Sequence, residues 1–172
     1  MKQAPQGLPD GRGLRVAVLH AAFNGEIVRG LVDGALAALV AMRVARSAIV
    51  VEELPGAFEL PLAAAVAAES GRFDAIVALG AVIRGDTDHY DHVAREAATG
   101  LATVAREARL PVSFGVLTVT DIEQARRRAV PGPENKGGEA ARAAVAAALA
   151  LRRLSGARGT RRRSVARSRR SA

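Results

Sequence analysis

The sequence predicts an α/β domain in which a four-stranded parallel sheet is covered by helices on both faces. Four short runs rich in branched apolar residues alternate with longer segments whose apolar residues recur at helical spacing. The third run, DAIVALGAVI at residues 74–83, is apolar throughout, which is typical of a strand buried on both faces. Because a helix follows each strand, the connections are crossovers of the kind that join parallel strands.

The expected elements follow in order along the chain. The first helix carries apolar residues from Ile27 to Val40 at helical spacing, and Asn24 is expected to cap it. A later short helix is expected to run from an Asp121 cap through Ala129. The four strands are expected at 14–20, 47–54, 74–83 and 111–119, and the remaining helices at about 60–70, 93–108 and 138–154.

The chain of 172 residues suits one domain, flanked by two segments of different composition. Residues 1–13 are rich in Gly and Pro and are expected to form an irregular arm, which leaves 14–154 as the domain. From Arg152 to Ala172 there are nine arginines and no acids. Without them the net charge of +8 becomes −1 for residues 1–151, so the basicity belongs to the C-terminal segment. Residues 155–172 have no apolar periodicity and are expected to be a disordered tail.

Several classes of protein are excluded by composition. There are no cysteines, so the chain has neither disulfides nor thiolate metal sites. The first residues have no apolar core of the kind that a signal peptide carries, and no apolar run is long enough to span a bilayer. We therefore expect a soluble, cytoplasmic protein with no membrane partner.

Unusual local sequences follow all four expected strands. Phe23-Asn24 follows the first, PGAFE the second, RGDTDHYDH the third, and the turn from Thr118 to Asp121 the fourth. The carboxyl ends of parallel strands meet at one edge of a sheet, and ligands bind beyond that edge. The sequence therefore predicts a site built from four loops on one rim.

The stretch GDTDHYDHV after the third strand allows three interpretations. Its aspartates and histidines are ligand types for a divalent metal, but they match neither the HExxH nor the calcium-loop spacing. Asp88 and Asp91 also suit the solvated first turn of a helix, where acids are favoured. Gly85 and Thr87 at a strand-to-helix turn indicate free backbone N–H groups that bind an anion. In that case Asp86 and Asp88 should point outward, because their charges repel a phosphate.

Side chains in the other loops also have a functional and a structural interpretation. His89 at the rim is either a proton-transfer residue or a surface histidine. Phe23 and Phe58 would flank a flat ring, and Glu59 would accept hydrogen bonds from a polyol or from ring N–H groups. Alternatively, Glu59 caps a helix and Phe58 packs locally.

Two cationic stretches lie near the last helix. The first is a run of three arginines, Arg126, Arg127 and Arg128. Most of this run is expected to be solvated, but one member would reach an anion. NKGG at 135–138 places a cation between flexible residues before a helix, and a plain turn is the alternative.

Taken together and in order, these motifs resemble lumazine synthases. The resemblance covers residues from about Leu14 to Leu154, nearly the whole domain. It is carried by FN after the first strand, PGAFELP after the second, GAVIRGDTDHYDHV after the third, then GVLTVTDIEQARRRA and NKG.

The resemblance implies a flavodoxin-like α/β/α sandwich and an enzyme of riboflavin biosynthesis. The implied reaction condenses 5-amino-6-(D-ribitylamino)uracil with 3,4-dihydroxy-2-butanone 4-phosphate to 6,7-dimethyl-8-ribityllumazine, the penultimate step of the pathway. It needs no metal and no organic cofactor. A non-catalytic, flavin- or lumazine-binding or cage-forming paralogue, whose basic tail binds nucleic acid or other polyanions, is the alternative.

The resemblance also implies residue roles. His89 matches the proton-transfer histidine, and Phe114 resembles a residue that the neighbouring subunit contributes. The implied ribitylaminouracil-binding residues are Phe23, Ala57, Phe58, Glu59, Ala81, Val82, Ile83 and Phe114, of which Phe23 stacks on the ring, Glu59 holds the polyol and residues 81–83 bind through the backbone. The implied phosphate-binding residues are Asp86, Thr87, Arg128 and Lys136.

The implied assembly is a homopentamer with its sites between subunits, and some members of the family close into sixty-subunit shells. The turn AVPGPENKG has no long insertion, which is compatible with a shell, although Pro131 and Pro133 stiffen it. Asp86 and Asp88 depart from the family, which often has small or neutral residues there. We expect this departure to affect phosphate affinity.

Overall fold

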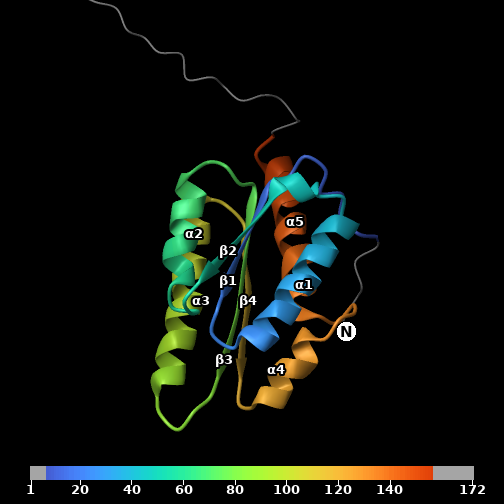
Figure 1. Ribbon diagram of the computed structural model, residues 1–172. Helices are drawn as coiled ribbons and strands as arrows, with labels where there is room; N and C mark the ends of the chain where they lie inside the picture. The colour runs from blue at the N-terminus through green and yellow to red at the C-terminus, as the bar shows by residue number, and fades with distance from the viewer. Residues whose placement is uncertain (1–6, 157–172) are drawn as a thin grey trace, which may run out of the picture.

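A computed structural model describes residues 7–156 and shows a four-stranded parallel sheet. The strands are β1 (Val16–Ala21), β2 (Ile49–Leu54), β3 (Ala75–Ile83) and β4 (Val112–Val119). Their order in the sheet is β2-β1-β3-β4, and every neighbouring pair is parallel, so β2 and β4 form the edges (Figure 1). The expected fold class, a three-layer α/β sandwich with a parallel sheet, is confirmed.

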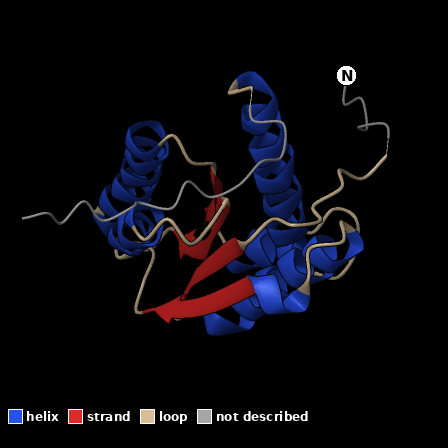
Figure 2. Cartoon of the chain, turned by 90° about the horizontal axis from the view of Figure 1, so that it is seen from above, coloured by secondary structure: helices blue, strands red, loops and turns tan. Residues whose placement is uncertain are grey.

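Helices cover both faces of the sheet (Figures 1 and 2). The face covered by α1, α4 and α5 lies opposite the face covered by α2 and α3. The helices are α1 (Gly25–Ala41), α2 (Leu60–Glu69), α3 (His89–Ala108), α4 (Ile122–Ala129) and α5 (Lys136–Leu154), and a 3₁₀ turn, η1 (Arg46–Ala48), precedes β2.

Successive side chains along each strand point to opposite faces of the sheet and contribute to two hydrophobic cores. Val16 and Val18 of β1 join the core under α1 and α5, whereas Ala17 and Leu19 join the core under α2 and α3. This is the two-residue period of a strand with both faces covered. The first eight residues of β3 are all buried, as its apolar run predicts.

All expected strands and helices are present, with shifted ends. The strands begin one or two residues later than expected, and the helix expected at 138–154 begins at Lys136. The Asp121 cap is confirmed, because its carboxylate accepts a hydrogen bond from the backbone N–H of Gln124 at 2.8 Å. The expected side-chain cap at Asn24 is wrong: its amide donates to the carbonyl of Ala81 on β3 at 2.8 Å instead.

The NKGG stretch is neither flexible nor a plain turn. Asn135 is 1% exposed and caps α5 by accepting the backbone N–H of Gly138 at 3.0 Å. Gly137 and Gly138 lie inside the helix and are buried against α1. A Cβ on Gly137 would stand 1.9 Å from the carbonyl oxygen of Leu31, and one on Gly34 would stand 2.0 Å from the Asn135 side chain. The glycines therefore allow α1 and α5 to approach closely.

The described residues cover most of the chain. Residues 7–13 lie outside the helices and strands, and the rest of the expected arm, residues 1–6, lies outside the described residues. The expected disorder of the tail falls mainly on 157–172, which are also outside the described residues. No helix within residues 7–156 is long and apolar enough to cross a membrane.

Candidate active site

The loops after β1, β2 and β3 enclose a cavity of about 630 Å³ at the carboxyl edge of the sheet. The connection from β1 to α1 supplies Phe23 and Asn24, and the connection from β2 to α2 supplies residues 55–59. The end of β3 and the first turn of α3 complete the lining. The sequence-predicted residues in this lining are Phe23, Ala57, Phe58, Glu59, Ala81, Val82, Ile83, Thr87 and His89.

Two aromatic rings stand at this cavity with much of their surface in water. Phe23 is 72% exposed and Phe58 is 56% exposed, although both line the cavity. Local packing of Phe58 therefore leaves more than half of the side chain uncovered. Exposed aromatic faces at a concave site suit the stacking of a planar ring.

Glu59 lies at the N-terminus of α2, but its side chain does not cap the helix. The residue occupies the N-cap position, but its side chain accepts no capping hydrogen bond. A Cβ on Gly56 would stand 3.1 Å from a Glu59 carboxylate oxygen, so the carboxylate lies over the glycine. Both carboxylate oxygens are thus available to a ligand hydroxyl or N–H group.

Asn24, which was expected to cap α1, lines the cavity. It adopts a left-handed conformation with φ of 59°, which short polar residues tolerate better than most. Its side chain occupies one lone pair of the Ala81 carbonyl and thereby ties the loop after β1 to the end of β3. The Phe-Asn-Gly sequence was the available signal, because Asn before Gly is common where the backbone turns sharply.

The start of α3 presents unpaired backbone donors. The N–H groups of residues 85–90 donate to no acceptor within the described part of the chain, whereas that of Arg84 donates to Val119 on β4 at 2.9 Å. Gly85, Thr87 and His89 line the cavity here. Asp86 and Asp88 are exposed and do not line it. Free donors at a helix N-terminus are suited to bind an anion.

Arg84 contacts this turn from outside the cavity. Its guanidinium lies 5.0 Å from the centre of the Tyr90 ring and 3.6 Å from a carboxylate oxygen of Asp91. Tyr90 and His92 line the cavity, and sequence analysis gave neither a role in binding substrate. The contacts of Arg84 therefore hold the first turn of α3, in which His89 is the first residue.

Three of the remaining predicted residues lie at a second cavity of about 400 Å³ along the β4 edge, whereas Asp86 lines neither cavity. Phe114 is 45% exposed, and Arg128 and Lys136 approach the same cavity from α4 and α5. Arg128 donates to the backbone carbonyl of Gln124 at 2.9 Å, and Lys136 forms an ion pair with Glu139. One subunit thus carries the predicted site residues in two separate groups.

Among the three consecutive arginines only Arg128 lines either cavity. Arg126 pairs with Glu123 at 2.6 Å and with Glu26 at 3.6 Å. The hydrogen bond that Arg126 donates to the Glu123 carboxylate is the main cause of the raised pKa of Arg126. Arg127 is exposed. The three consecutive arginines therefore have different surroundings because they point in different directions around α4.

The acidic stretch does not gather into a metal centre. Within residues 7–156, no three His, Cys, Asp or Glu side chains form a group that could hold a metal ion. The chemistry that the larger cavity offers is ring stacking, hydrogen bonding to a polyol, anion binding by backbone N–H groups, and proton transfer by an exposed histidine.

The comparison with protein families agrees with this arrangement. The family described as 6,7-dimethyl-8-ribityllumazine synthase matches residues 13–152, which is most of the chain and includes every residue of both cavities. The chain therefore belongs to the lumazine synthase family, whose members are transferases of riboflavin biosynthesis.

Proposed function

We propose that this protein condenses 5-amino-6-(D-ribitylamino)uracil with 3,4-dihydroxy-2-butanone 4-phosphate to form 6,7-dimethyl-8-ribityllumazine. The observation that carries the proposal is the larger cavity, in which nine of the predicted residues meet, from the connections after β1 and β2, the end of β3 and the start of α3. The family match over residues 13–152 supports the same reaction. We assign the catalytic domain to residues 14–154.

The ribitylaminouracil is assigned to the part of the cavity between the loops after β1 and β2. Phe23 offers its exposed ring for stacking, and Glu59 accepts hydrogen bonds from the ribityl hydroxyls. The backbone of residues 81–83 binds the pyrimidine edge. Asn24 supports this role, because its hydrogen bond to the Ala81 carbonyl fixes the strand end against which the pyrimidine lies.

The phosphate is assigned to the start of α3. Free N–H groups between Gly85 and Tyr90 donate to its oxygens, and the Thr87 hydroxyl adds a further donor. Because Asp86 and Asp88 stand outside the cavity lining, their carboxylates do not occupy the anion position. Arg128 and Lys136 supply the compensating positive charge, which strengthens hydrogen bonds to phosphate.

His89 is assigned the proton transfers. An amine adds to a ketone, the carbinolamine loses water, phosphate leaves, and the ring closes with loss of a second water. Each step moves a proton, and none transfers a hydride or an electron. A positioned histidine contributes about 10²- to 10⁴-fold to such a reaction. Binding both substrates together contributes more, because their encounter becomes effectively intramolecular.

The two cavities support an oligomer in which the site is completed between subunits. Phe114, Arg128 and Lys136 share the β4-edge cavity, while the stacking and proton-transfer residues lie in the other. We propose a homopentamer, in which the β4 edge of one copy closes the larger cavity of the next. Further closure into a sixty-subunit shell is compatible with the short turn at residues 130–135.

A steady-state assay of lumazine formation tests the reaction. The wild-type protein should exceed the no-protein rate, because the condensation also proceeds slowly unaided. His89→Ala should lower kcat by about 10²-fold. Arg128→Ala should raise KM for the butanone phosphate by roughly 10- to 100-fold, the loss expected for a hydrogen bond to a charged group. The matched control is Arg127→Ala, which removes the exposed neighbouring arginine and should leave both constants unchanged. A wild-type rate equal to the blank would overturn the proposal.

A further inference from the structure

The larger cavity has no lysine or arginine among the residues 7–156 that line it. The side chains in its lining that can carry a charge near neutral pH are Glu59, His89 and His92. A phosphate bound at the start of α3 brings up to about two negative charges. The exposed carboxylates of Asp86 and Asp88 add two more beside the same turn. Positive charge from this chain must therefore come from a histidine.

The arginines and the lysine close to the cavity do not replace that charge. The guanidinium of Arg84 lies outside the lining, where it contacts the Tyr90 ring and a carboxylate oxygen of Asp91. Arg128 and Lys136 line the other cavity, so they reach the phosphate only from a second copy of the chain. Within one chain, the two histidines are the groups in the lining that can become cations.

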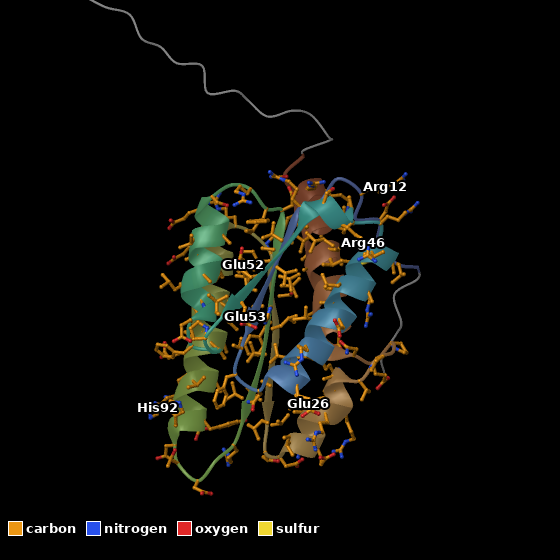
Figure 3. All side chains as sticks on the ribbon, in the orientation of Figure 1. Arg12, Glu26, Arg46, Glu52, Glu53 and His92 are labelled. Carbon is orange, nitrogen blue, oxygen red and sulfur yellow. The ribbon has the colours of Figure 1, made fainter. Side chains whose placement is uncertain are left out.

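His92 lies next to His89 on the surface of α3. The helix begins at His89, and residues three apart on a helix have Cβ atoms about 5–6 Å apart. Side chains on a helix lean toward its N-terminus, so the ring of His92 covers the turn that carries the unpaired N–H groups of residues 85–90. Figure 3 shows His92 on the side of α3 turned away from the sheet, near the start of the helix. It therefore stands at the mouth of the cavity, beside the anion site.

The imidazole of His92 has no partner within residues 7–156. The side chain is exposed, and the one ion pair that a histidine forms in this part of the chain joins His20 to Glu53 at 3.9 Å. The charged or titratable groups around His92 are Asp88, His89, Arg95 and Glu96 on or beside α3, Asp86 in the preceding turn and Glu59 from the loop after β2. None of the carboxylates forms an ion pair with His92 in the described part of the chain. Both ring nitrogens are thus available to a ligand.

We propose that the protonated imidazole of His92 donates a hydrogen bond to the phosphate of the butanone phosphate and supplies the positive charge that the cavity lining lacks. The inference rests on the proposed reaction and adds a residue to its phosphate site. Hydrogen bonds from a cation to phosphate are stronger than those between neutral groups. The charge of His92 also offsets the negative charges of Asp86 and Asp88, with which this chain departs from its family.

The two histidines then have separate tasks. His89 gains and loses a proton in every turnover, so its charge changes during the reaction. His92 needs only to keep its proton while the phosphate is bound. Because an imidazole ordinarily titrates in the neutral range, the contribution of His92 is present at low pH and is lost as the pH rises. The phosphate of the substrate also titrates in this range, but that change affects every variant alike.

The KM for the butanone phosphate at two pH values tests the inference. His92→Gln keeps an N–H donor but no positive charge, so it should raise KM by about 10-fold at about pH 6 and by less than about twofold at about pH 8.5. Its kcat should change by less than about threefold. His92→Lys keeps a cation at both pH values and should therefore have a lower KM than the wild type at about pH 8.5.

The matched control is His20→Gln, which removes a histidine that lines neither cavity and should leave KM unchanged at both pH values. If the ratio of KM between His92→Gln and the wild type were the same at both pH values, His92 would not act through its charge. A His92→Lys variant that behaved like His92→Gln would overturn the inference in the same way.

Binding can also be measured without turnover, because the chain has only three histidines. Sulfate stays doubly charged in this pH range and serves as the probe for the phosphate position. In NMR spectra of protein with labelled histidine rings, sulfate at about pH 6 should shift the signal of His92 and leave that of His20 in place. The two Gln variants assign the signals. A shifted His92 signal in a protein that forms no lumazine would contradict the proposed reaction and retain the anion contact. Turnover with an unmoved His92 signal would overturn the inference alone.

Discussion

At the scale of single residues, the candidate site depends on side chains that connect loops as well as on those that line the cavity. Asn24 links the loop after β1 to the end of β3, and Arg84 links the end of β3 to the first turn of α3. Neither residue was predicted to act in this way. Both contacts are testable, because each has a substitution that removes the interaction and leaves the backbone conformation allowed.

Asn24 combines a hydrogen bond with a left-handed backbone, and substitutions separate the two. Asn24→Gly keeps the conformation at little cost and removes the hydrogen bond to Ala81, so it should lower the free energy of unfolding by about 1 kcal/mol. Asn24→Ala removes the same hydrogen bond but keeps a Cβ in the left-handed region, which Gly lacks and which Ala tolerates less well than Asn, so it should cost about 1 kcal/mol more than Asn24→Gly. Urea unfolding should therefore rank Asn above Gly and Gly above Ala. An Ala variant more stable than the Gly variant would contradict the assigned conformation.

Arg84 should act as a positioning residue for the first turn of α3. Arg84→Met removes an exposed cation–π contact and a weak ion pair, which together contribute about 1 kcal/mol to the order of that turn. We expect kcat to fall about fivefold, with a change in its pH profile because His89 is displaced, while the melting temperature changes by only a few degrees.

The control for Arg84 is Arg72→Met. Arg72 lies 5.2 Å from the ring centre of Phe73 in the segment before β3, so it loses the same kind of contact at the end of the sheet opposite the site. Its pH profile should match that of the wild type. If both variants changed kcat equally, Arg84 would have only a structural role.

At the scale of elements, the contact between α1 and α5 fixes the positions of Arg128 and Lys136. The Asn135 amide donates to the carbonyls of Gly30 in α1 and of Ala129 and Val130 at the end of α4. The same side chain caps α5, of which Lys136 is the first residue. One buried amide thus joins three helices beside the β4-edge cavity.

The free energy of unfolding should therefore depend strongly on which residue replaces Asn135. Asn135→Asp keeps the size and a capping oxygen but places a carboxylate against three carbonyl oxygens, so it should destabilise the fold more than Asn135→Ala. The Ala variant loses a cap and leaves buried carbonyls unsatisfied, at about 2 to 4 kcal/mol. Asp121→Ala, which removes an exposed cap, should cost about 1 kcal/mol and serves as the reference. Chemical denaturation that ranks Asp above Ala at position 135 would contradict the donor pattern.

Substitution of the glycines between α1 and α5 should also destabilise the fold. Gly34→Ala places its Cβ 2.0 Å from the Asn135 side chain, so the helices must separate, and overpacking of this kind costs about 1–3 kcal/mol or more. Gly25→Ala, at the exposed start of the same helix, should be neutral or slightly stabilising, because only the flexible end of Arg29 approaches it. Thermal unfolding of the two variants measures the difference. Equal melting temperatures would show that the helices do not need the close approach.

Element types were predictable because their signals are local. The apolar run at 74–83 and the helical spacing from Ile27 to Val40 each reflect burial of one or both faces, which sequence records directly. The behaviour of Asn24, Asn135 and Gly137 was not predictable in this way. Each depends on a partner that is distant in sequence, such as Ala81 for Asn24 and Leu31 for Gly137.

At the scale of the whole molecule, the sheet topology explains which parts of the site could be predicted. Parallel strands bring the loops after β1, β2 and β3 to one edge, and nine of the predicted residues meet there. The resemblance implies that Phe114 acts from a neighbouring subunit, but the motifs did not predict that Arg128 and Lys136 share a cavity with it at the β4 edge. It depends on the strand order, which places β4 at the edge of the sheet and β1 beside β3.

Topology also separates the two charged ends of the molecule. The segments that precede the strands or end α5 carry nine arginines and four acids, whereas the loops after the strands carry the candidate site. The net charge conceals this division, because residues 7–156 hold equal numbers of basic and acidic side chains.

The central claim is that the two cavities form one catalytic site across a subunit contact, and a subunit-mixing assay tests it most directly. One variant carries Phe23→Ala with His89→Ala, and the other carries Arg128→Ala. Each alone should form lumazine slowly. After joint unfolding and refolding in equal amounts, about a quarter of the contacts should pair an intact larger cavity with an intact β4 edge, and the rate should recover toward a quarter of the wild-type value. A mixture no faster than the average of the two separate variants would contradict the account.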